Sequence, residues 1–364
     1  MIPADSNASY APPGFVIFGL QESLFAQLFD AASLKLVGRA VALREPVAGW
    51  PTDCILYFSV SENGVLVYRD RTLGELQLAW YNRAGTRQES VGEPGLYSYM
   101  NAAPDARRLA VHRSDPETRT PDIWSLELTN GILTRVTSSG GAFPIMSPDG
   151  REVVFSSDRE VKPGLYRKKI GGTAEELLLE SNELPVAQHW LRDGSILFSL
   201  ELPHTNPAKG DFYRLPTSGA RKPVLLFETA FAKRSARVSS DGRWVAYESD
   251  ASGRWEVYLA AFPSFTENRQ VSVGGGCQPV WREDDKELFY LSLAGKLMSI
   301  DVRSAKMGET SVPRMLFQVP FQVDERGRQY SVSGDGDKFL FPEQVERTSP
   351  PITVVLNWTA ALKR

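Results

Sequence analysis

Pro148-Asp149-Gly150-Arg151, followed by Glu152-Val153-Val154-Phe155-Ser156, is a tight polar turn that leads into an apolar strand. The same unit recurs at Ser240-Asp241-Gly242-Arg243 and at Arg192-Asp193-Gly194-Ser195, each again before an apolar run. In such a turn the Asp side chain accepts a hydrogen bond from the backbone two residues on, and Gly adopts a positive φ without a steric penalty. The unit therefore predicts a turn between two antiparallel strands.

Weaker copies of this unit extend the repeat over the whole chain. The positions equivalent to Gly150 are spaced 42 to 51 residues apart, at Gly14, Gly64, Ala106, Gly150, Gly194, Gly242, Asp285 and Gly336. A period near 45 residues with several short strands in each period is typical of β-propeller blades. The residues predicted to form these structural turns are Asp105, Asp149, Gly150, Asp193, Gly194, Asp241, Gly242 and Asp284.

Each period has room for four short antiparallel strands, so the sequence predicts an all-β propeller of about eight four-stranded modules. The apolar residues three before each Asp are expected to pack between blades; they are Ala102, Met146, Trp190, Val238, Trp281 and Val332. The last module has strands at 330–332, 338–341 and 352–358 but no fourth strand.

Two domain organisations fit this pattern. One is a single ring of seven or eight blades over residues 1–364. The alternative is a six-bladed propeller over residues 86–364, closed by a strand near Thr86 to Val91, with residues 1–85 forming extra blade modules. A closed ring leaves a propeller without exposed sheet edges, and each of the two organisations would close the ring.

Composition excludes several classes of protein. The 364 residues are 42% hydrophobic and 23% charged, which is typical of a globular chain, and the net charge of −3 argues against a nucleic-acid partner. No apolar run is long enough to span a membrane, and the first residues do not form a secretory signal. We therefore expect the chain as written to be cytoplasmic. Cys54 and Cys277 are expected to be buried small hydrophobes.

The repeats resemble the TolB-like, WD-repeat-like propeller family over essentially the full chain. Three stretches are also similar to the C-terminal region of large bacterial serine/threonine protein kinases: Asp5 to Gly14, Phe58 to Tyr68 and Pro351 to Trp358. In those kinases a cytoplasmic kinase domain precedes the propeller region, usually across a membrane segment, which would place the propeller outside the inner membrane. The kinase motifs themselves are absent from this sequence, so kinase activity is not implied for it.

Sequence motifs for catalysis are also missing. The chain has three histidines, His112, His189 and His204, without the spacing of a zinc site, and it has no nucleophile elbow and no phosphate-binding loop. We expect His112 to have a structural role and His204 to be solvated. His189 is the most interesting of the three, because it precedes Trp190 on a predicted inner strand, although a structural role is favoured for it too. No cofactor is expected.

We therefore expect a non-catalytic module that binds an unknown protein or small molecule, as a sensor or interaction region related to the receptor-like kinases. Periodicity places four polar residues at the funnel of the propeller as candidate ligand-binding residues: Asn101, His189, Arg237 and Gln278. Their alternative role is to satisfy hydrogen bonds between blades. Two other functions stay open, a propeller hydrolase or lyase acting on a glycan or lactone, and a truncated fragment of a larger kinase without independent function.

Overall fold

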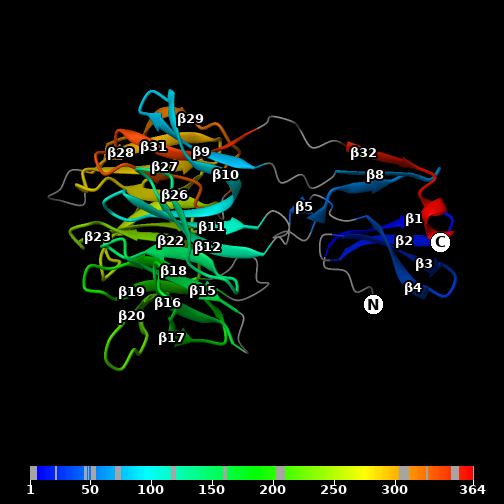
Figure 1. Ribbon diagram of the computed structural model, residues 1–364, viewed down its shortest axis with the longest axis horizontal. Coiled ribbons are helices and arrows are strands. Elements are labelled where there is room, and N and C mark those ends of the chain that lie inside the picture. Colours follow the sequence, from blue (N-terminus) through cyan, green and yellow to red (C-terminus); the bar gives the residue numbers. More distant parts are fainter. Residues whose placement is uncertain are drawn as a thin grey trace. The chain divides into compact units, whose positions relative to one another are not determined.

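The computed structural model describes residues 6–20, 23–44, 47, 49–50, 55–69, 75–115, 120–158, 162–201, 210–302, 311–324, 327–345 and 352–363. These residues form strands and one 3-10 helix, Trp358–Lys363, with no α-helix among them (Figure 1). Within this described part, no helix is long and apolar enough to cross a bilayer. The chain divides into two compact units, unit 1 (1–74 and 346–364) and unit 2 (75–345).

Unit 2 contains five consecutive four-stranded antiparallel modules, numbered here in chain order. The first consists of the C-terminal half of β10 (Arg87–Ala102) with β11 (Arg108–Ser114), β12 (Pro121–Glu127) and β13 (Leu133–Arg135). The second consists of β14 (Ala142–Met146), β15 (Glu152–Ser157), β16 (Gly164–Lys169) and β17 (Glu175–Glu180). The third consists of β18 (Leu184–Trp190), β19 (Ile196–Glu201), β20 (Asp211–Leu215) and β21 (Val224–Phe227). The fourth consists of β22 (Lys233–Val238), β23 (Trp244–Ser249), β24 (Glu256–Ala261) and β25 (Arg269–Gln270). The fifth consists of β26 (Gly276–Trp281), β27 (Glu287–Ser292), β28 (Lys296–Asp301) and β29 (Arg314–Gln318).

A sixth module, called the closing module, joins the two ends of unit 2. It takes β30 (Ser331–Val332) and β31 (Lys338–Gln344) from the C-terminal side, and β9 (Leu76–Asn82) and the N-terminal half of β10 from the N-terminal side. β31 pairs with β9 over seven residue pairs, from Lys338 opposite Asn82 to Gln344 opposite Leu76. Because strands from both ends share one sheet, the ring has no open edge at this point.

The innermost strands contact one another in cyclic order, β10, β14, β18, β22, β26, β30 and back to β10. The predicted all-β propeller is confirmed, and unit 2 holds a ring of six modules. The start of β10, from Arg87 to Gly95, pairs with β9 within this ring. The first residue of unit 2 is Glu75, eleven positions before 86, because β9 belongs to the ring.

The repeated turns have the backbone conformation that their sequence requires. All eight positions equivalent to Gly150 have a positive φ, including the non-glycine residues Ala106 and Asp285. In the Asp149 turn the backbone N–H of Gly150 donates to the carbonyl of Ser147 over 2.9 Å, and Oδ1 of Asp149 accepts from the N–H of Arg151 over 3.1 Å. In four other turns the Asp side chain likewise accepts a hydrogen bond from the backbone N–H two residues later; these residues are Asp105, Asp193, Asp241 and Asp284.

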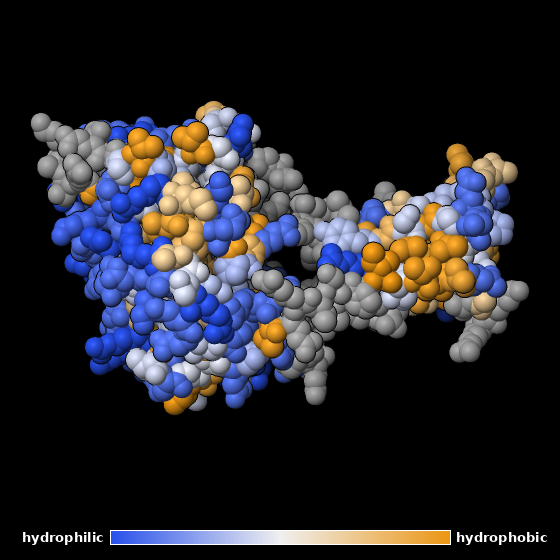
Figure 2. All heavy atoms as spheres, turned by 90° about the horizontal axis from the view of Figure 1, so that it is seen from above, coloured by the Kyte–Doolittle hydropathy of each residue, from blue (hydrophilic) through white to orange (hydrophobic). Residues whose placement is uncertain are grey.

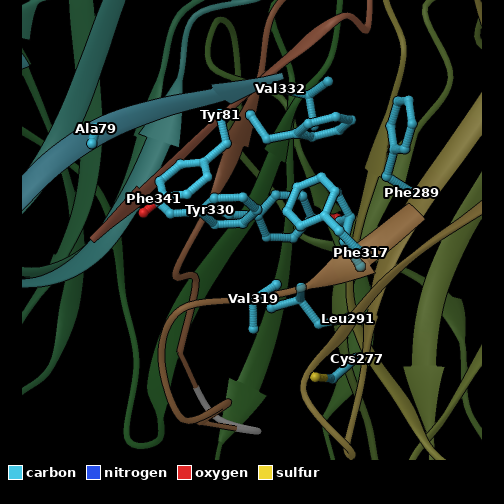
Figure 3. Packing of buried hydrophobic residues seen from close by; sticks show 12 residues of the cluster. Ala79, Tyr81, Cys277, Phe289, Leu291, Phe317, Val319, Tyr330, Val332 and Phe341 are labelled. Carbon is cyan, nitrogen blue, oxygen red and sulfur yellow. The ribbon is translucent and has the colours of Figure 1, made fainter. Parts of the chain in front are cut away.

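The core of unit 2 lies between neighbouring modules, with one apolar cluster at each of the six interfaces. The cluster between the fifth and closing modules is rich in aromatic rings, including Tyr81, Phe317, Phe339 and Phe341 (Figure 3). Of the six residues predicted to pack between blades, four are buried and two, Ala102 and Trp281, are half-buried. Burial of both sheet faces explains the apolar character of the inner strands.

Unit 1 contains the remaining sheets. The largest is β1 (Ala8–Ala11), β2 (Phe15–Leu20), β3 (Ser23–Asp30) and β4 (Lys35–Arg44). A three-stranded sheet holds β7 (Phe58–Val60), β8 (Val65–Arg69) and β32 (Ile352–Leu356), and a two-stranded sheet holds β5 (Gly49–Trp50) and β6 (Ile55–Leu56). The assignment of 352–358 to the last ring module was therefore wrong, because β32 pairs with β8 of unit 1 (Figure 1).

The surface of unit 1 carries a broad apolar area, which is orange in Figure 2. Large apolar side chains of unit 1 are exposed on β3, β4 and β32, namely Leu28, Val37, Val41, Ile352, Val354 and Leu356. The start of β3 is buried and its end is exposed or half-buried, whereas residues 35–43 of β4 are all exposed or half-buried.

Candidate functional site

A cavity of about 620 Å³ lies within unit 2, lined by the ends of inner strands and by the turns that follow them. The walls include apolar and aromatic side chains such as Trp190, Val238, Val280 and Trp281. Turn residues, among them Asp193 and Asp241, lie at the rim. A cavity of this size is large enough for a small-molecule ligand, and concave apolar sites with a few polar groups are the usual form of such sites.

All four candidate ligand-binding residues line this one cavity: Asn101, His189, Arg237 and Gln278. They come from four different modules, and the ring brings them together although they span 178 positions of sequence. Counting four residues back from the Asp of the other turns gives Ile145, Val280 and Ser331; Val280 and Ser331 line the cavity, whereas Ile145 is buried and does not.

Irregular pairing of the inner strands directs these side chains to the axis. The register of β18 with β19 shifts between Ala187 and His189, and that of β22 with β23 shifts between Arg234 and Arg237. In β26 the shift falls between Cys277 and Val280, where Gln278 has a positive φ. A bulge gives a strand one extra residue and re-aims the side chains next to it.

Three of the four residues, Asn101, Arg237 and Gln278, also form hydrogen bonds between modules. Oδ1 of Asn101 accepts a hydrogen bond from the backbone N–H of Met146 over 2.8 Å, which joins the first and second modules. Nε2 of Gln278 donates to the carbonyl of Asp324 over 2.8 Å, and its Oε1 accepts from the N–H of Gln329 over 2.7 Å. The alternative role, hydrogen bonding between blades, therefore applies to Asn101 and Gln278, and also to Arg237, which donates to the carbonyl of Gln188 on β18.

Arg237 belongs to an unusual pair of arginines. It is half-buried, and its Nη1 donates to the backbone carbonyl of Gln188 on the neighbouring strand β18. Arg328, which sequence analysis did not single out, donates from Nη2 to the same carbonyl oxygen over 3.0 Å. Two guanidinium groups, both from residues that line the cavity, therefore converge on one backbone oxygen atom.

Arg328 is deeply buried, with 5% of its surface exposed. Its guanidinium lies 5.1 Å from the centroid of the Tyr99 ring, and its Nη1 is buried without a hydrogen-bond partner in the described part of the chain. Burial lowers the pKa of Arg328, yet an arginine keeps its charge at neutral pH. A positive charge is thus held beside the cavity without a hydrogen-bonded carboxylate among the described residues.

His189 is neutral at physiological pH. Burial, and secondly the positive charge of Arg328, lower its pKa from 6.5 to about 4. A neutral imidazole both donates and accepts hydrogen bonds, so His189 adds no charge to the arginine pair.

The lowered pKa of His189 predicts a pH-dependent stability. Because the unfolded chain takes up a proton near pH 6.5 and the folded chain only near pH 4, the stabilising contribution is complete above 6.5 and is lost as the pH falls. We expect the native chain to lose roughly 1–2 kcal/mol more than His189→Gln between pH 7 and 5. Urea unfolding at both pH values measures the difference, and equal losses in the two proteins would contradict it. Burial lowers the pKa of His112 as well, but His112 is present in both proteins and therefore contributes equally to the two losses.

The acidic residues at the rim are engaged in ion pairs and turns. Asp193 pairs with Arg214, and Asp241 pairs with Arg243 over 2.7 Å. Asp285 accepts hydrogen bonds from the backbone N–H and the hydroxyl of Ser240, each over 2.6 Å. These carboxylates fix the turns that frame the cavity.

His112 and Cys277 lie outside the cavity lining. Nδ1 of His112 is 2.6 Å from Oγ of Ser98, which fits the structural role expected for His112. Cys277 is buried and is not part of a disulfide, whereas His204 and Cys54 lie outside the described residues. Among the described residues no group of three or more His, Cys, Asp or Glu side chains is arranged to hold a metal ion.

The most important residue that sequence analysis missed is Arg328. It lies in Asp324-Glu325-Arg326-Gly327-Arg328, a charged stretch that is typical of an exposed loop. Its carbonyl accepts from the N–H of Met100 over 2.9 Å, which fixes it beside β10 on the other side of the ring closure. A pairing between residues this far apart leaves no local signal in the sequence.

Comparison with known structures agrees with the geometry of the ring. No protein-family model matches the chain. A putative TolB from Agrobacterium tumefaciens is similar with a TM-score of 0.59 and 16% identity, covering 75% of this chain and 99% of that one. TolB from Acinetobacter baumannii is similar with a TM-score of 0.50 and 15% identity, covering 92% of this chain and 79% of that one. These two support a TolB-like propeller fold.

An enzyme appears among the more distant structures. An oligogalacturonate lyase from Vibrio parahaemolyticus matches with a TM-score of 0.43 and 14% identity, covering 82% of this chain and 95% of that one. At such distances a shared propeller says nothing about chemistry, since one fold supports many functions.

Proposed function

We propose that the six-module ring of unit 2 is a non-catalytic binding module whose ligand occupies the axial cavity. The observation that supports this most is the convergence of Asn101, His189, Arg237 and Gln278, from four modules, on one cavity of about 620 Å³. Rigid inner strands hold these side chains in place, as a preorganised site requires. From the sequence resemblance alone, we further propose a sensor or interaction role related to the receptor-like kinases.

The second candidate, a hydrolase or lyase, would need catalytic groups free to act on the substrate. Three of the four lining carboxylates, those of Asp193, Asp241 and Asp285 but not that of Glu283, are instead held by arginines or by neighbouring turns. We therefore favour binding over catalysis.

A ligand-observed nuclear magnetic resonance screen tests this proposal on the full chain. The library contains neutral, cationic and anionic aromatic fragments, and each is measured against the native chain and Ser331→Trp. Ser331 lines the cavity from β30, so an indole at this position fills the space a ligand would take. We expect fragments that bind the native chain and lose at least tenfold in affinity in Ser331→Trp. The double variant His189→Gln with Arg237→Gln is expected to lose the same fragments.

Ser331→Ala is the matched control, because it changes the same residue without filling the cavity. It should bind the fragments within twofold of the native affinity. Fragments that bind equally to Ser331→Trp, or the absence of any binding fragment, would contradict an axial ligand site.

A further inference from the structure

The charges around the axial cavity are unevenly placed. Seven charged lining residues lie in or beside the turns or on β20, three of them positive and four negative: Arg192, Arg214, Arg282, Asp193, Asp241, Glu283 and Asp285. On the inner strand β22 and just before β30, the charged lining residues are Arg237 and Arg328, both positive. His189 beside them is neutral at physiological pH.

The two arginines repel one another in their present arrangement. Both donate to the carbonyl oxygen of Gln188, so their guanidinium groups are close neighbours in a partly buried setting where charges interact strongly. Among the described residues neither forms an ion pair or a hydrogen bond with a carboxylate. An anion placed against both groups would offset this repulsion and would receive charge-assisted hydrogen bonds.

We propose that the ligand of the axial cavity carries an oxyanion head group, a carboxylate or a phosphate, on an apolar body. The head group would lie against Arg237, within the field of Arg328, since planar guanidinium groups match both kinds of oxyanion. The apolar body would lie along Trp190, Val280 and Trp281 in the cavity wall. This inference rests on the proposed function, because it names the chemistry of the ligand for the same site.

Three naphthalene compounds that differ only in the head group provide the test. Binding of naphthalene-2-carboxylate, 2-naphthyl phosphate and naphthalene-2-carboxamide to the full chain is measured by isothermal titration calorimetry. We expect at least one oxyanion to bind tenfold or more tightly than the neutral carboxamide, and to weaken as salt is added. The tighter of the two oxyanions identifies the head group.

Substitutions of Arg237 and Arg192 test whether Arg237 causes the preference for an oxyanion over the neutral carboxamide. In Arg237→Gln the preference for the oxyanion should fall below threefold, while Arg237→Lys should keep part of it. Folding is expected to survive, because Nη2 of Arg328 still satisfies the carbonyl of Gln188. Arg192→Gln is the control, since Arg192 is an exposed arginine at the rim of the same cavity, and it should bind within twofold of the native chain.

The outcomes separate the two proposals. If the carboxamide binds as tightly as the oxyanions, and Ser331→Trp abolishes its binding, the cavity is a ligand site but the oxyanion inference is wrong. A preference that persists in Arg237→Gln, or that disappears in Arg192→Gln, also overturns it. If none of the three compounds binds and the fragment screen finds no cavity ligand either, the proposed function itself fails.

Discussion

Phe341→Ala is expected to lower the free energy of unfolding of unit 2 by about 3–5 kcal/mol, the usual cost of truncating a buried phenylalanine to alanine. Phe341 is fully buried in β31 of the closing module. Its ring lies 5.5 Å from that of Tyr81 on β9 and 5.9 Å from those of Phe317 and Tyr330, measured between centroids (Figure 3). The substitution therefore leaves a cavity where both ends of unit 2 meet.

Hydrogen exchange of the backbone amides in β9 and β31 measures this effect, because it reports on the ring separately from unit 1. Phe231→Ala is the matched control, since 48% of Phe231 is exposed, and its cost should stay below about 0.5 kcal/mol. A loss under about 1 kcal/mol in Phe341→Ala would mean that β31 and β9 do not close the ring.

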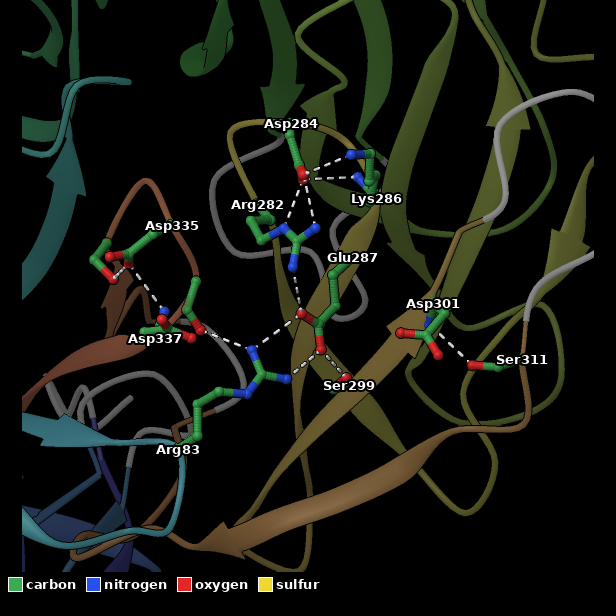
Figure 4. Close-up of polar contacts among 12 residues, drawn as sticks. Arg83, Arg282, Asp284, Lys286, Glu287, Ser299, Asp301, Ser311, Asp335 and Asp337 are labelled. Carbon is green, nitrogen blue, oxygen red and sulfur yellow. Dashed lines mark hydrogen bonds and ion pairs between the residues drawn. The ribbon is translucent and has the colours of Figure 1, made fainter.

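Glu287→Gln is expected to destabilise the ring by about 3–5 kcal/mol, because it leaves arginines without their buried carboxylate. Glu287 is 2% exposed, and its Oε1 accepts from Nη2 of Arg83 over 2.6 Å while its Oε2 accepts from Nη1 of Arg83 over 3.0 Å. Arg282 and Ser299 also donate to Glu287 (Figure 4), and so does Nη2 of Arg314. Since Arg83 follows β9, this network links the closing module to the fifth module.

The pH dependence of this effect has a definite sign. Burial alone would raise the pKa of Glu287, but the hydrogen bonds from Arg83 and Ser299 and the arginine charges outweigh it, so the pKa lies below 4.5. The stabilising contribution is therefore present above pH 4.5 and is lost as the pH falls through the lowered pKa. Chemical unfolding at pH 7 and about pH 3.5 should show a smaller gap between Glu287→Gln and the native chain at the lower pH.

Arg107→Gln is the control for the network, because the Arg107 side chain is largely exposed and its Nε lies 4.0 Å from Oδ2 of Asp105 in its own turn. Exposed ion pairs of this kind contribute little to stability. A Glu287→Gln variant as stable as Arg107→Gln would show that Glu287 does not join the two modules.

The propeller fold was predictable because each module repeats the same local sequence pattern, a polar turn followed by an apolar strand. The turn of Asp149 and Gly150 is specified within five residues by an Asx hydrogen bond and a positive φ, and the period between turns sets the module length. The closing strand was also predictable in outline, since a ring without open edges needs a partner for β31.

Two features could not be predicted from the sequence, because they depend on contacts between distant parts of the chain. β32 has the alternating pattern of any strand, and only tertiary pairing decides that it joins β8 and not β31. Arg237 could be placed at the axis by periodicity, but its shared acceptor with Arg328 depends on contacts across 91 positions of sequence. The location of the cavity was therefore accessible from the repeat, while the positive charge in its wall was not.

A crystal structure of the full chain with 6-bromonaphthalene-2-carboxylate tests the central claim most directly, since anomalous scattering locates the bromine without ambiguity. We predict the bromine in the axial cavity, with the carboxylate at hydrogen-bond distance from Arg237. A bromine found only on the exposed apolar strands of unit 1, with the axial cavity empty, would contradict the claim that the ring of unit 2 is the binding module.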